Sequence, residues 1–319
     1  MKCNFAIRLK KMKKLNITIT GDLGSGKSSI AKELCKMLNY KYFSTGSIQR
    51  EIGKKTGMNT LELNYFSEQN PDIDKYIDDL VIKINEEDDS YVVDSRMAWH
   101  FIHESYKIYL TVNPIIAAKR VISDNHRVNE PVVEEINEKS LNLLERRAAE
   151  DKRFKTKYGV DCSDLSNFDL VIDTTIPSVE DISTLIFKLY KDFSRNTAVN
   201  KYWVSPKILF PTKLIRESGQ DEARQVIQSI FNYNYDKSSL VETIKLGSDF
   251  FIWDGHKRIS EAIFNKIPLI PIGILAKDDE EIHPGNIVSH FIETTFNPDW
   301  LYDWENFHGF RFESYPQVK

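Results

Sequence analysis

The hydrophobic residues of the first 190 positions gather in short runs that alternate with longer stretches of helical spacing. The run LNITIT at 15–20 is apolar and β-branched, glycines follow it at once, and Ile30, Leu34 and Leu38 then recur at helical spacing. This pattern predicts a strand, a loop and a helix. Further runs that predict strands lie at 40–44, 90–94, 107–112 and 169–173, and helical stretches lie at 71–84 and 132–152.

Strands that alternate with helices predict an α/β fold, a parallel sheet covered by helices on both faces. The pattern loosens after Leu189 into KDFSRNTAVN at 191–200, which is polar and has no periodicity. A chain of 319 residues also exceeds the usual size of a single core. We therefore predict one domain at 12–195 and a second at 200–319.

The second part predicts a smaller α+β unit. A polar helix is expected near 219–231. The stretch at 249–275 then predicts a strand, a tight turn at Asp254 and Gly255, a helix, and a final strand broken by Pro268 and Pro271.

The last 30 residues are too rich in aromatic side chains for a free tail. We predict an arm that packs across the two domains or against a second copy of the chain in a homodimer. The aromatic residues are Phe291, Phe296, Trp300, Tyr302, Trp304, Phe307, Phe310, Phe312 and Tyr315.

Composition narrows the class of protein. The formal net charge of -4 and the pI near 6.0 argue against a general affinity for nucleic acid. Cys3, Cys35 and Cys162 are widely spaced, with no Cys or His nearby at metal-ligand spacing, and predict reduced thiols. The chain has no apolar run long enough to span a membrane, and its basic first 14 residues lack a signal-peptide core. We predict a cytoplasmic protein.

The segment GDLGSGKS at 21–28 fits the phosphate-loop pattern G-x-x-x-x-G-K-[ST]. Glycines let backbone N–H groups converge on phosphate oxygens, and the following helix offers its positive end. Lys27 is expected to reach the β- and γ-phosphates of ATP, and the Ser28 hydroxyl to ligate Mg²⁺. The alternative, a chance match in a turn, is disfavoured by the strand before it and the helix after it. The predicted ATP-binding residues are Gly21, Gly24, Ser25, Gly26, Lys27, Ser28 and Ser29.

Two further segments suit an anionic acceptor. FSTGSIQRE at 43–51 is a small polar turn with Ser44 and Gly46, followed by Arg50 on the opening helix. VVDSRMAW at 92–99 places Asp94 and Arg96 at the carboxyl end of a strand, the edge at which open parallel sheets bind ligands. These five residues are the predicted substrate-binding set.

The order and spacing of these blocks resemble the cytidylate kinase family, in particular its compact archaeal-type members. The resemblance covers about residues 15–190, and includes NPDIDKYIDD at 70–79, ERRAAEDKRFKTKYGV at 145–160 and the closing DLVIDTT. It implies transfer of the ATP γ-phosphate to CMP or dCMP, with Mg²⁺. Ser95, where the family commonly has glycine, and the aromatic segment at 98–106 depart from the family pattern and bear on the acceptor's identity.

The resemblance also implies roles for single residues. Arg50 and Arg96 would grip the acceptor's phosphate, and Asp94 would help to hold the Mg²⁺ shell or an acceptor-side arginine. Lid-helix arginines, Arg146 and Arg153, would close over the phosphates in flight. The implied catalytic set is Lys27, Arg96, Arg146 and Arg153, with Arg120 and Arg147 as neighbours.

The lid helix has a simpler interpretation. Arginines on a charged helix are often solvated, or pair with glutamates such as Glu145 and Glu150 four residues away. Of these arginines, Arg147 is the one for which a catalytic role is least favoured over this simpler interpretation.

In the second part, WDGHKRISEA at 253–262 resembles the DGHHR block of the ParB/sulfiredoxin-like fold, with KILFPTKLIRES at 207–218 before it and IPLIPI at 267–272 after it. A sharp turn followed by basic residues at a helix start suits an anion or a nucleotide phosphate. The alternative is a helix start with solvated charges. The predicted second site consists of Asp254, Gly255, His256, Lys257 and Arg258.

Relatives with this block include partition proteins that bind CTP, sulfiredoxins, and free-serine kinases. The sulfiredoxin cysteine has no counterpart here, and Lys213 stands where a serine kinase would carry a catalytic glutamate, with Glu217 four residues late. Three hypotheses remain. The chain is a nucleoside monophosphate kinase with an accessory nucleotide-binding domain, a bifunctional enzyme with a small-molecule kinase at its C-terminus, or a kinase fused to a ParB-like nucleotide-sensing regulator.

Overall fold

The computed structural model describes residues 15–58, 62–63, 66, 70–124, 135–195, 197, 200–214 and 240–316. Its strands are β1 (Asn16–Gly21), β2 (Lys41–Ser44), β3 (Tyr91–Asp94), β4 (Ser105–Thr111), β5 (Leu170–Asp173), β6 (Tyr202–Val204), β7 (Leu209–Phe210), β8 (Val241–Leu246), β9 (Asp249–Asp254), β10 (Ile270–Lys277), β11 (Glu281–His283) and β12 (Asn286–Ile287).

The α-helices in the same residues are α1 (Lys27–Leu38), α2 (Thr45–Thr56), α4 (Pro71–Lys83), α5 (Ala98–Phe101), α6 (Pro114–Ser123), α7 (Ile136–Tyr158), α8 (Val179–Phe193), α10 (His256–Phe264), α11 (Val288–Thr295) and α12 (Asp299–His308). Local sequence explains several of their ends. Asn113 caps α6 ahead of Pro114, and Ser178 and Asp181 form a capping box on α8. None of the described helices is long and apolar enough to cross a membrane.

The N-terminal half forms the parallel sheet that the sequence predicts. Strands β2, β3, β1, β4 and β5 lie side by side in that order, and all of their pairings are parallel. On one face, Ile19 and Leu110 pack with Leu34 of α1 and residues of α8. On the other face, Tyr109 and Val171 pack with residues that include Phe154 of α7. Helices therefore cover both faces, as predicted.

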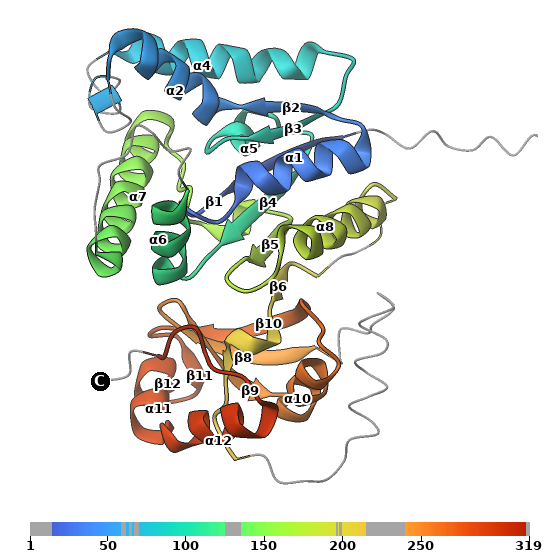
Figure 1. Cartoon of the computed structure of the whole chain (residues 1–319), viewed down its shortest axis with the longest axis vertical. Coiled ribbons are helices and arrows are strands. Elements are labelled where there is room, and N and C mark those ends of the chain that lie inside the picture. The colour runs from blue at the N-terminus through green and yellow to red at the C-terminus, as the bar shows by residue number, and fades with distance from the viewer. Residues whose placement is uncertain are drawn as a thin grey trace, which may run out of the picture.

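The sheet does not end at the predicted domain boundary. Strand β6 pairs with β5 in parallel, β10 pairs with β6 antiparallel, and the order continues as β8, β9 and β7, so that the described strands include one ten-stranded sheet (Figure 1). Trp203 and Leu269, which follow the boundary, pack in the same core as Leu189. The C-terminal part also has a core of its own, centred on residues such as Phe251, Ile259 and Trp304. A separate ParB/sulfiredoxin-like domain stays a prediction.

In the C-terminal part, one strand differs from the prediction, and one predicted helix cannot be compared with the structure. Strand β10 begins at Ile270 and runs through Pro271, where we expected a break. Since β8 joins β10 only from Ile272 onward, β10 is paired on one side at the proline, a place where strands tolerate it. The helix predicted near 219–231 and Cys3 lie outside the described residues, and Cys35 and Cys162 are free thiols.

The aromatic C-terminal stretch connects the two parts. Leu301, Trp304 and Phe312 are buried in the C-terminal core. The chain after α12 then returns to the N-terminal half, where Asn113 donates a hydrogen bond of 2.9 Å from its side-chain nitrogen to the Ser314 hydroxyl. The stretch thus lies as an arm across both parts, and a homodimer stays a prediction.

Candidate active site

The phosphate loop follows β1 and has the tight backbone that its glycines predict. Gly21, Gly24 and Gly26 have positive φ angles of 138°, 81° and 82°. A Cβ atom would lie 2.1 Å from the Leu110 carbonyl oxygen at Gly21 and 2.9 Å from Ala117 at Gly24, so the loop has no room for side chains there. No side chain of the described residues caps the N-terminus of α1, and an uncapped helix start of this kind suits an anion.

The polar side chains of the loop lie close to its own backbone. Lys27 donates from its ammonium to the carbonyl oxygens of Gly21, at 3.1 Å, and Asp22, at 2.6 Å. Ser25 is buried and donates to the Asp22 carbonyl oxygen as well. Ser29 is exposed on α1. Lys27 therefore lies across the loop, next to the space that phosphates would enter.

Ser28 and Asp94 meet at the carboxyl edge of the sheet. The Ser28 hydroxyl donates to Asp94 Oδ2 at 2.6 Å, and the Tyr42 hydroxyl donates to the same oxygen at 3.3 Å. A hydroxyl and a carboxylate are hard oxygen ligands, and Mg²⁺ is commonly held by one or two such groups together with waters and substrate phosphates. The pair fits Mg²⁺, although the described residues contain no cluster of three or more acidic, His or Cys ligands.

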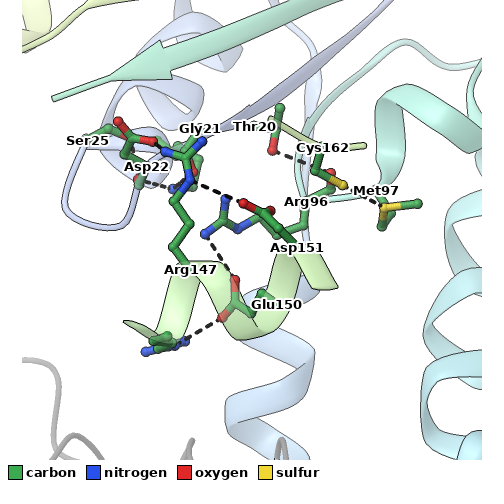
Figure 2. A network of polar contacts seen from close by, with 12 residues as sticks. Thr20, Gly21, Asp22, Ser25, Arg96, Met97, Arg147, Glu150, Asp151 and Cys162 are labelled. Carbon is green, nitrogen blue, oxygen red and sulfur yellow. Dashed lines mark hydrogen bonds and ion pairs between the residues drawn. The ribbon is translucent and has the colours of Figure 1, made fainter. Parts of the chain in front are cut away.

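Arg96 follows β3 and belongs to a buried ionic network. Its Nη2 atom lies 3.0 Å from Glu150 Oε2, and Glu150 Oε1 accepts from Arg146 Nε at 3.0 Å (Figure 2). The Arg96–Glu150 contact is an ion pair but not an aligned hydrogen bond, because neither atom has a hydrogen-bond partner among the residues that the structure describes. Burial alone would raise the pKa of Glu150, but the charges of Arg96 and Arg146 outweigh it and lower that pKa.

A second contact ties the lid helix α7 to the phosphate loop. Arg147 pairs with the Asp22 carboxylate and also donates to the Tyr109 hydroxyl. Asp22 in turn accepts from Tyr109, at 3.1 Å, and from the Val112 backbone N–H, at 3.1 Å. Figure 2 shows Arg147 reaching from α7 to the loop. Sequence reasoning ranked Arg147 low and missed Asp22, because the loop pattern leaves that position open.

A cleft of about 60 Å³ opens beside Arg96, and we call it the acceptor-side cleft because it contains this predicted acceptor residue. Arg153 lines it, with its guanidinium over the Phe154 ring, and its Nε atom has no hydrogen-bond partner in the described part of the chain. The structure therefore brings Arg96 and Arg153 together. The cleft is lined by Thr45, Gln49, Asp74, Ile77, Asp78, Val81, Ser95, Arg96, Met97, Phe101, Glu150, Arg153, Phe154 and Tyr158.

The other predicted acceptor residues lie at the start of α2. Ser44 is the N-cap of that helix and accepts from the Ser47 backbone N–H at 3.3 Å. Arg50 is exposed, donates to the Ser47 hydroxyl at 3.1 Å, and approaches Gly46. Neither Arg50 nor Gly46 lines the cleft.

The structure adds two acidic residues of α4 that sequence reasoning did not select. Asp74 pairs with Lys157 at 3.1 Å, and Asp78 accepts from the Tyr158 hydroxyl at 2.6 Å. Burial raises the pKa of Asp78. Their spacing of four residues, on one side of a predicted helix, was the signal that could have found them.

Arg120 braces the phosphate loop from the far side. Its guanidinium donates to the carbonyl oxygens of Thr174, at 2.6 Å, and Thr175, at 3.1 Å, just after β5, and to that of Gly24 at 3.4 Å. Burial lowers the pKa of Arg120. The residue thus links the loop backbone to the end of β5.

The predicted second site lies at the start of α10, after Gly255 with a φ of 105°. Arg258 pairs with Asp254 at 2.5 Å and donates to the Leu240 carbonyl oxygen at 2.7 Å. His256 is buried and accepts from the Thr212 backbone N–H at 3.1 Å, and burial lowers its pKa to about 3. Lys257 and Lys213 are exposed, and Glu217 lies outside the described residues. His256 and Arg258 are therefore engaged internally.

Comparisons with known proteins match the N-terminal part. Residues 17–149 match the family described as an AAA domain. The chain is 37% identical over 172 residues to the cytidylate kinase of Sulfurisphaera tokodaii, which covers 53% of this chain and 92% of that protein. It is 34% identical over 174 residues to the cytidylate kinase of Sulfolobus acidocaldarius, over 54% and 92% of the two chains. For the cytidylate kinase of Thermoplasma volcanium the values are 31% over 199 residues, 61% and 98%. These matches give no support to the ParB/sulfiredoxin-like resemblance.

Proposed function

Because the chain belongs to the cytidylate kinase family through its N-terminal half, we propose that it transfers the γ-phosphoryl group of ATP to CMP or dCMP. Membership makes the chain a phosphotransferase of the kinase type and supports nucleoside monophosphate kinase activity. The main support for CMP or dCMP as the acceptor is the position of two residues at the end of β3. Asp94 there contacts Ser28 of the phosphate loop, and Arg96, two residues on, lines the acceptor-side cleft.

The donor half of the proposed site is the phosphate loop and the first turn of α1. ATP phosphates would replace the loop carbonyls as partners of the Lys27 ammonium, and would accept from backbone N–H groups at the start of α1. Ser28 and Asp94 would hold Mg²⁺, which, when bound, neutralises charge on the β- and γ-phosphates.

The acceptor half is the cleft with Arg96 and Arg153. Arg96 Nη2 lies near Glu150 but has no aligned hydrogen-bond partner among the described residues, so it can donate to an acceptor phosphate. Arg153 would donate its unpartnered Nε–H in the same cleft, and Arg146 would approach from the same helix. Thr45 and Gln49 of α2 line the cleft, and Arg50 of the same helix would join them by turning its exposed side chain toward it. Phosphoryl transfer then needs positioned cations and no dedicated base.

Lys27→Ala tests the proposal directly. The variant should lose CMP-dependent ADP formation by at least about a hundredfold, because a cation that stabilises the transferring phosphoryl group is gone. Lys36→Ala is the matched control, since Lys36 lies on the same helix with its side chain 73% exposed in a surface pair. An unchanged rate in Lys27→Ala would overturn the proposal.

The acceptor is tested separately. Initial rates with CMP, dCMP, UMP and AMP at fixed ATP should give the highest kcat/KM for CMP or dCMP. A preference for UMP or AMP would refute the proposed acceptor and leave the kinase assignment intact. For the C-terminal part, phosphate binding at residues 254–258 and the bifunctional and regulatory alternatives stay predictions.

A further inference from the structure

The phosphate loop rests on residues 112–120, the end of β4's loop and most of α6, which we call the loop platform. A backbone N–H of the platform donates to the Asp22 carboxylate at 3.1 Å, and Leu23 packs against the apolar cluster that α6 forms. A Cβ atom on Gly24 would lie 2.9 Å from Ala117. The platform thus contacts three successive residues of the loop, so the position of α6 limits the positions that the loop can take.

The C-terminal arm contacts the first residue of α6's cap. Asn113 is the N-cap of that helix, and its Oδ1 atom accepts from the backbone N–H groups of Ile115, at 3.0 Å, and Ile116, at 3.4 Å. Its Nδ2 atom donates to the Ser314 hydroxyl at 2.9 Å, and its backbone N–H donates to the Thr175 hydroxyl at 3.0 Å. The side chain that caps α6 is therefore oriented by a residue of the arm.

A second contact between the arm and the platform is weaker. Glu313 lies 3.8 Å from the Lys119 ammonium, and the two side chains are 53% and 47% exposed. Exposed ion pairs of this kind contribute little, because water screens the charges. The hydrogen bond of Ser314 is therefore the contact on which a coupling between the arm and α6 would depend.

The arm is fixed on both sides of this hydrogen bond. The Phe312 backbone N–H, at 2.8 Å, and the Tyr315 hydroxyl, at 2.9 Å, both donate to Oε1 of Glu305, which is 1% exposed on α12. Phe312 is buried and its ring lies 4.9 Å from that of Phe210. The two residues between these points form a short bridge whose ends are held by the C-terminal part, so Ser314 pays little conformational entropy to contact α6.

We propose that Ser314 is a positioning residue of the donor site: it holds the Asn113 cap and, through α6, keeps the phosphate loop in the conformation that binds the phosphates of ATP. The inference rests on the donor half of the proposed function and adds to it a contribution from the C-terminal part. The acceptor-side cleft is lined by neither the loop platform nor the arm. Loss of the Ser314 contact should therefore act on ATP and not on CMP.

Calorimetric titration of the full chain with ATP and Mg²⁺, and separately with CMP, tests the inference. Ser314→Ala should weaken ATP binding by about threefold or more, within the two- to tenfold range that one hydrogen bond represents, and should leave CMP binding unchanged. Asn113→Ser, which retains a capping residue but not the contact, should have the same effect. The double variant should bind ATP no more weakly than the weaker single variant, because both remove one interaction. Ser289→Ala, which removes an exposed hydroxyl contact on α11, is the matched control.

Hydrogen exchange of the ligand-free protein separates this inference from the proposed reaction. Peptides that cover residues 21–30 should exchange at least about threefold faster in Ser314→Ala, and those that cover 41–44 should exchange as in the wild type. If the wild type binds no ATP, the proposed function fails, and the exchange rates alone decide whether the arm positions the loop. Where the wild type does bind ATP, equal ATP affinity of Ser314→Ala, or an equal loss of ATP and CMP affinity, would show that Ser314 does not position the donor site.

Discussion

The ionic network around Glu150 makes a quantitative prediction for Glu150→Gln. The side chains of Arg96 and Glu150 are only 15% and 11% exposed, and Glu150 contacts Arg146 as well. The substitution keeps the shape and one acceptor oxygen but removes the negative charge between two arginines. It therefore leaves Arg96 as a buried cation without its counter-charge.

The size of the effect follows from that burial. Removing one partner of a fully buried ion pair costs about 3 to 5 kcal/mol. Glutamine retains a hydrogen bond to Arg146, and solvent reaches part of that guanidinium, so we expect the free energy of unfolding to fall by about 2 to 3 kcal/mol at pH 7. The double variant Arg96→Met/Glu150→Gln should lose at least about 1 kcal/mol less than the sum of the two single variants, because it leaves no uncompensated charge.

Urea unfolding of the ligand-free protein measures these differences, and Glu145→Gln, an exposed position on the same helix, is the control. The pKa of Glu150 is lowered in the folded protein from its ordinary value of 4.5. The stability that its charge provides is therefore present above about pH 4.5 and is lost as the pH falls through the folded value. A loss under about 0.5 kcal/mol at pH 7, or a difference that does not shrink below about pH 4.5, would refute the reasoning.

Three further predictions concern single sites. Burial lowers the pKa of His256 to about 3, so the unfolded chain binds a proton below about pH 6.5 that the folded chain does not. Relative to His256→Gln, the free energy of unfolding of the wild type should therefore fall by about 1.4 kcal/mol per pH unit between pH 6.5 and 3. Urea unfolding at pH 7 and 5.5 measures this difference, with the exposed His290→Gln as the control. Ser28→Ala should raise the Mg²⁺ concentration needed for half-maximal rate by at least about tenfold while Ser28→Thr keeps it, and an equal response of the two variants would exclude Ser28 as a ligand. Arg153→Ala should raise the KM for CMP more than Arg50→Ala does, because Arg153 lines the cleft and Arg50 is exposed. The reverse order, in initial-rate kinetics, would show that Arg50 and not Arg153 is the main contact of the acceptor.

The local sequence was sufficient to predict the structure of the phosphate loop, the donor side of the proposed site. A glycine-rich loop between an apolar strand and an amphipathic helix has few possible structures, and the contacts of Gly21 and Gly24 show why those positions exclude side chains. The pairing of Ser28 with Asp94 could also be anticipated. Ser28 lies at the start of α1, just after the loop that follows β1, Asp94 ends β3, and β1 and β3 are paired neighbours in the parallel sheet.

The contacts that the sequence did not predict are those between elements distant in the chain. Asp22 fills a variable position of the loop pattern, and its pairing with Arg147 depends on how α7 packs, which periodicity does not specify. Arg146 pairs with Glu150 at the ordinary helical spacing of four residues, while Arg96 joins the same carboxylate from another element. The choice among the arginines of α7 therefore required the tertiary structure.

The shared sheet changes the relation between the two parts of the chain. Strand β6 covers what would otherwise be the open edge of β5, and Trp203 is buried in the N-terminal core. Just past β5, Arg120 joins the Thr174 carbonyl oxygen to that of Gly24 in the phosphate loop. A displacement of β6 would thus act on β5 and, through Arg120, on the loop backbone. The C-terminal part is for this reason a structural extension of the N-terminal sheet.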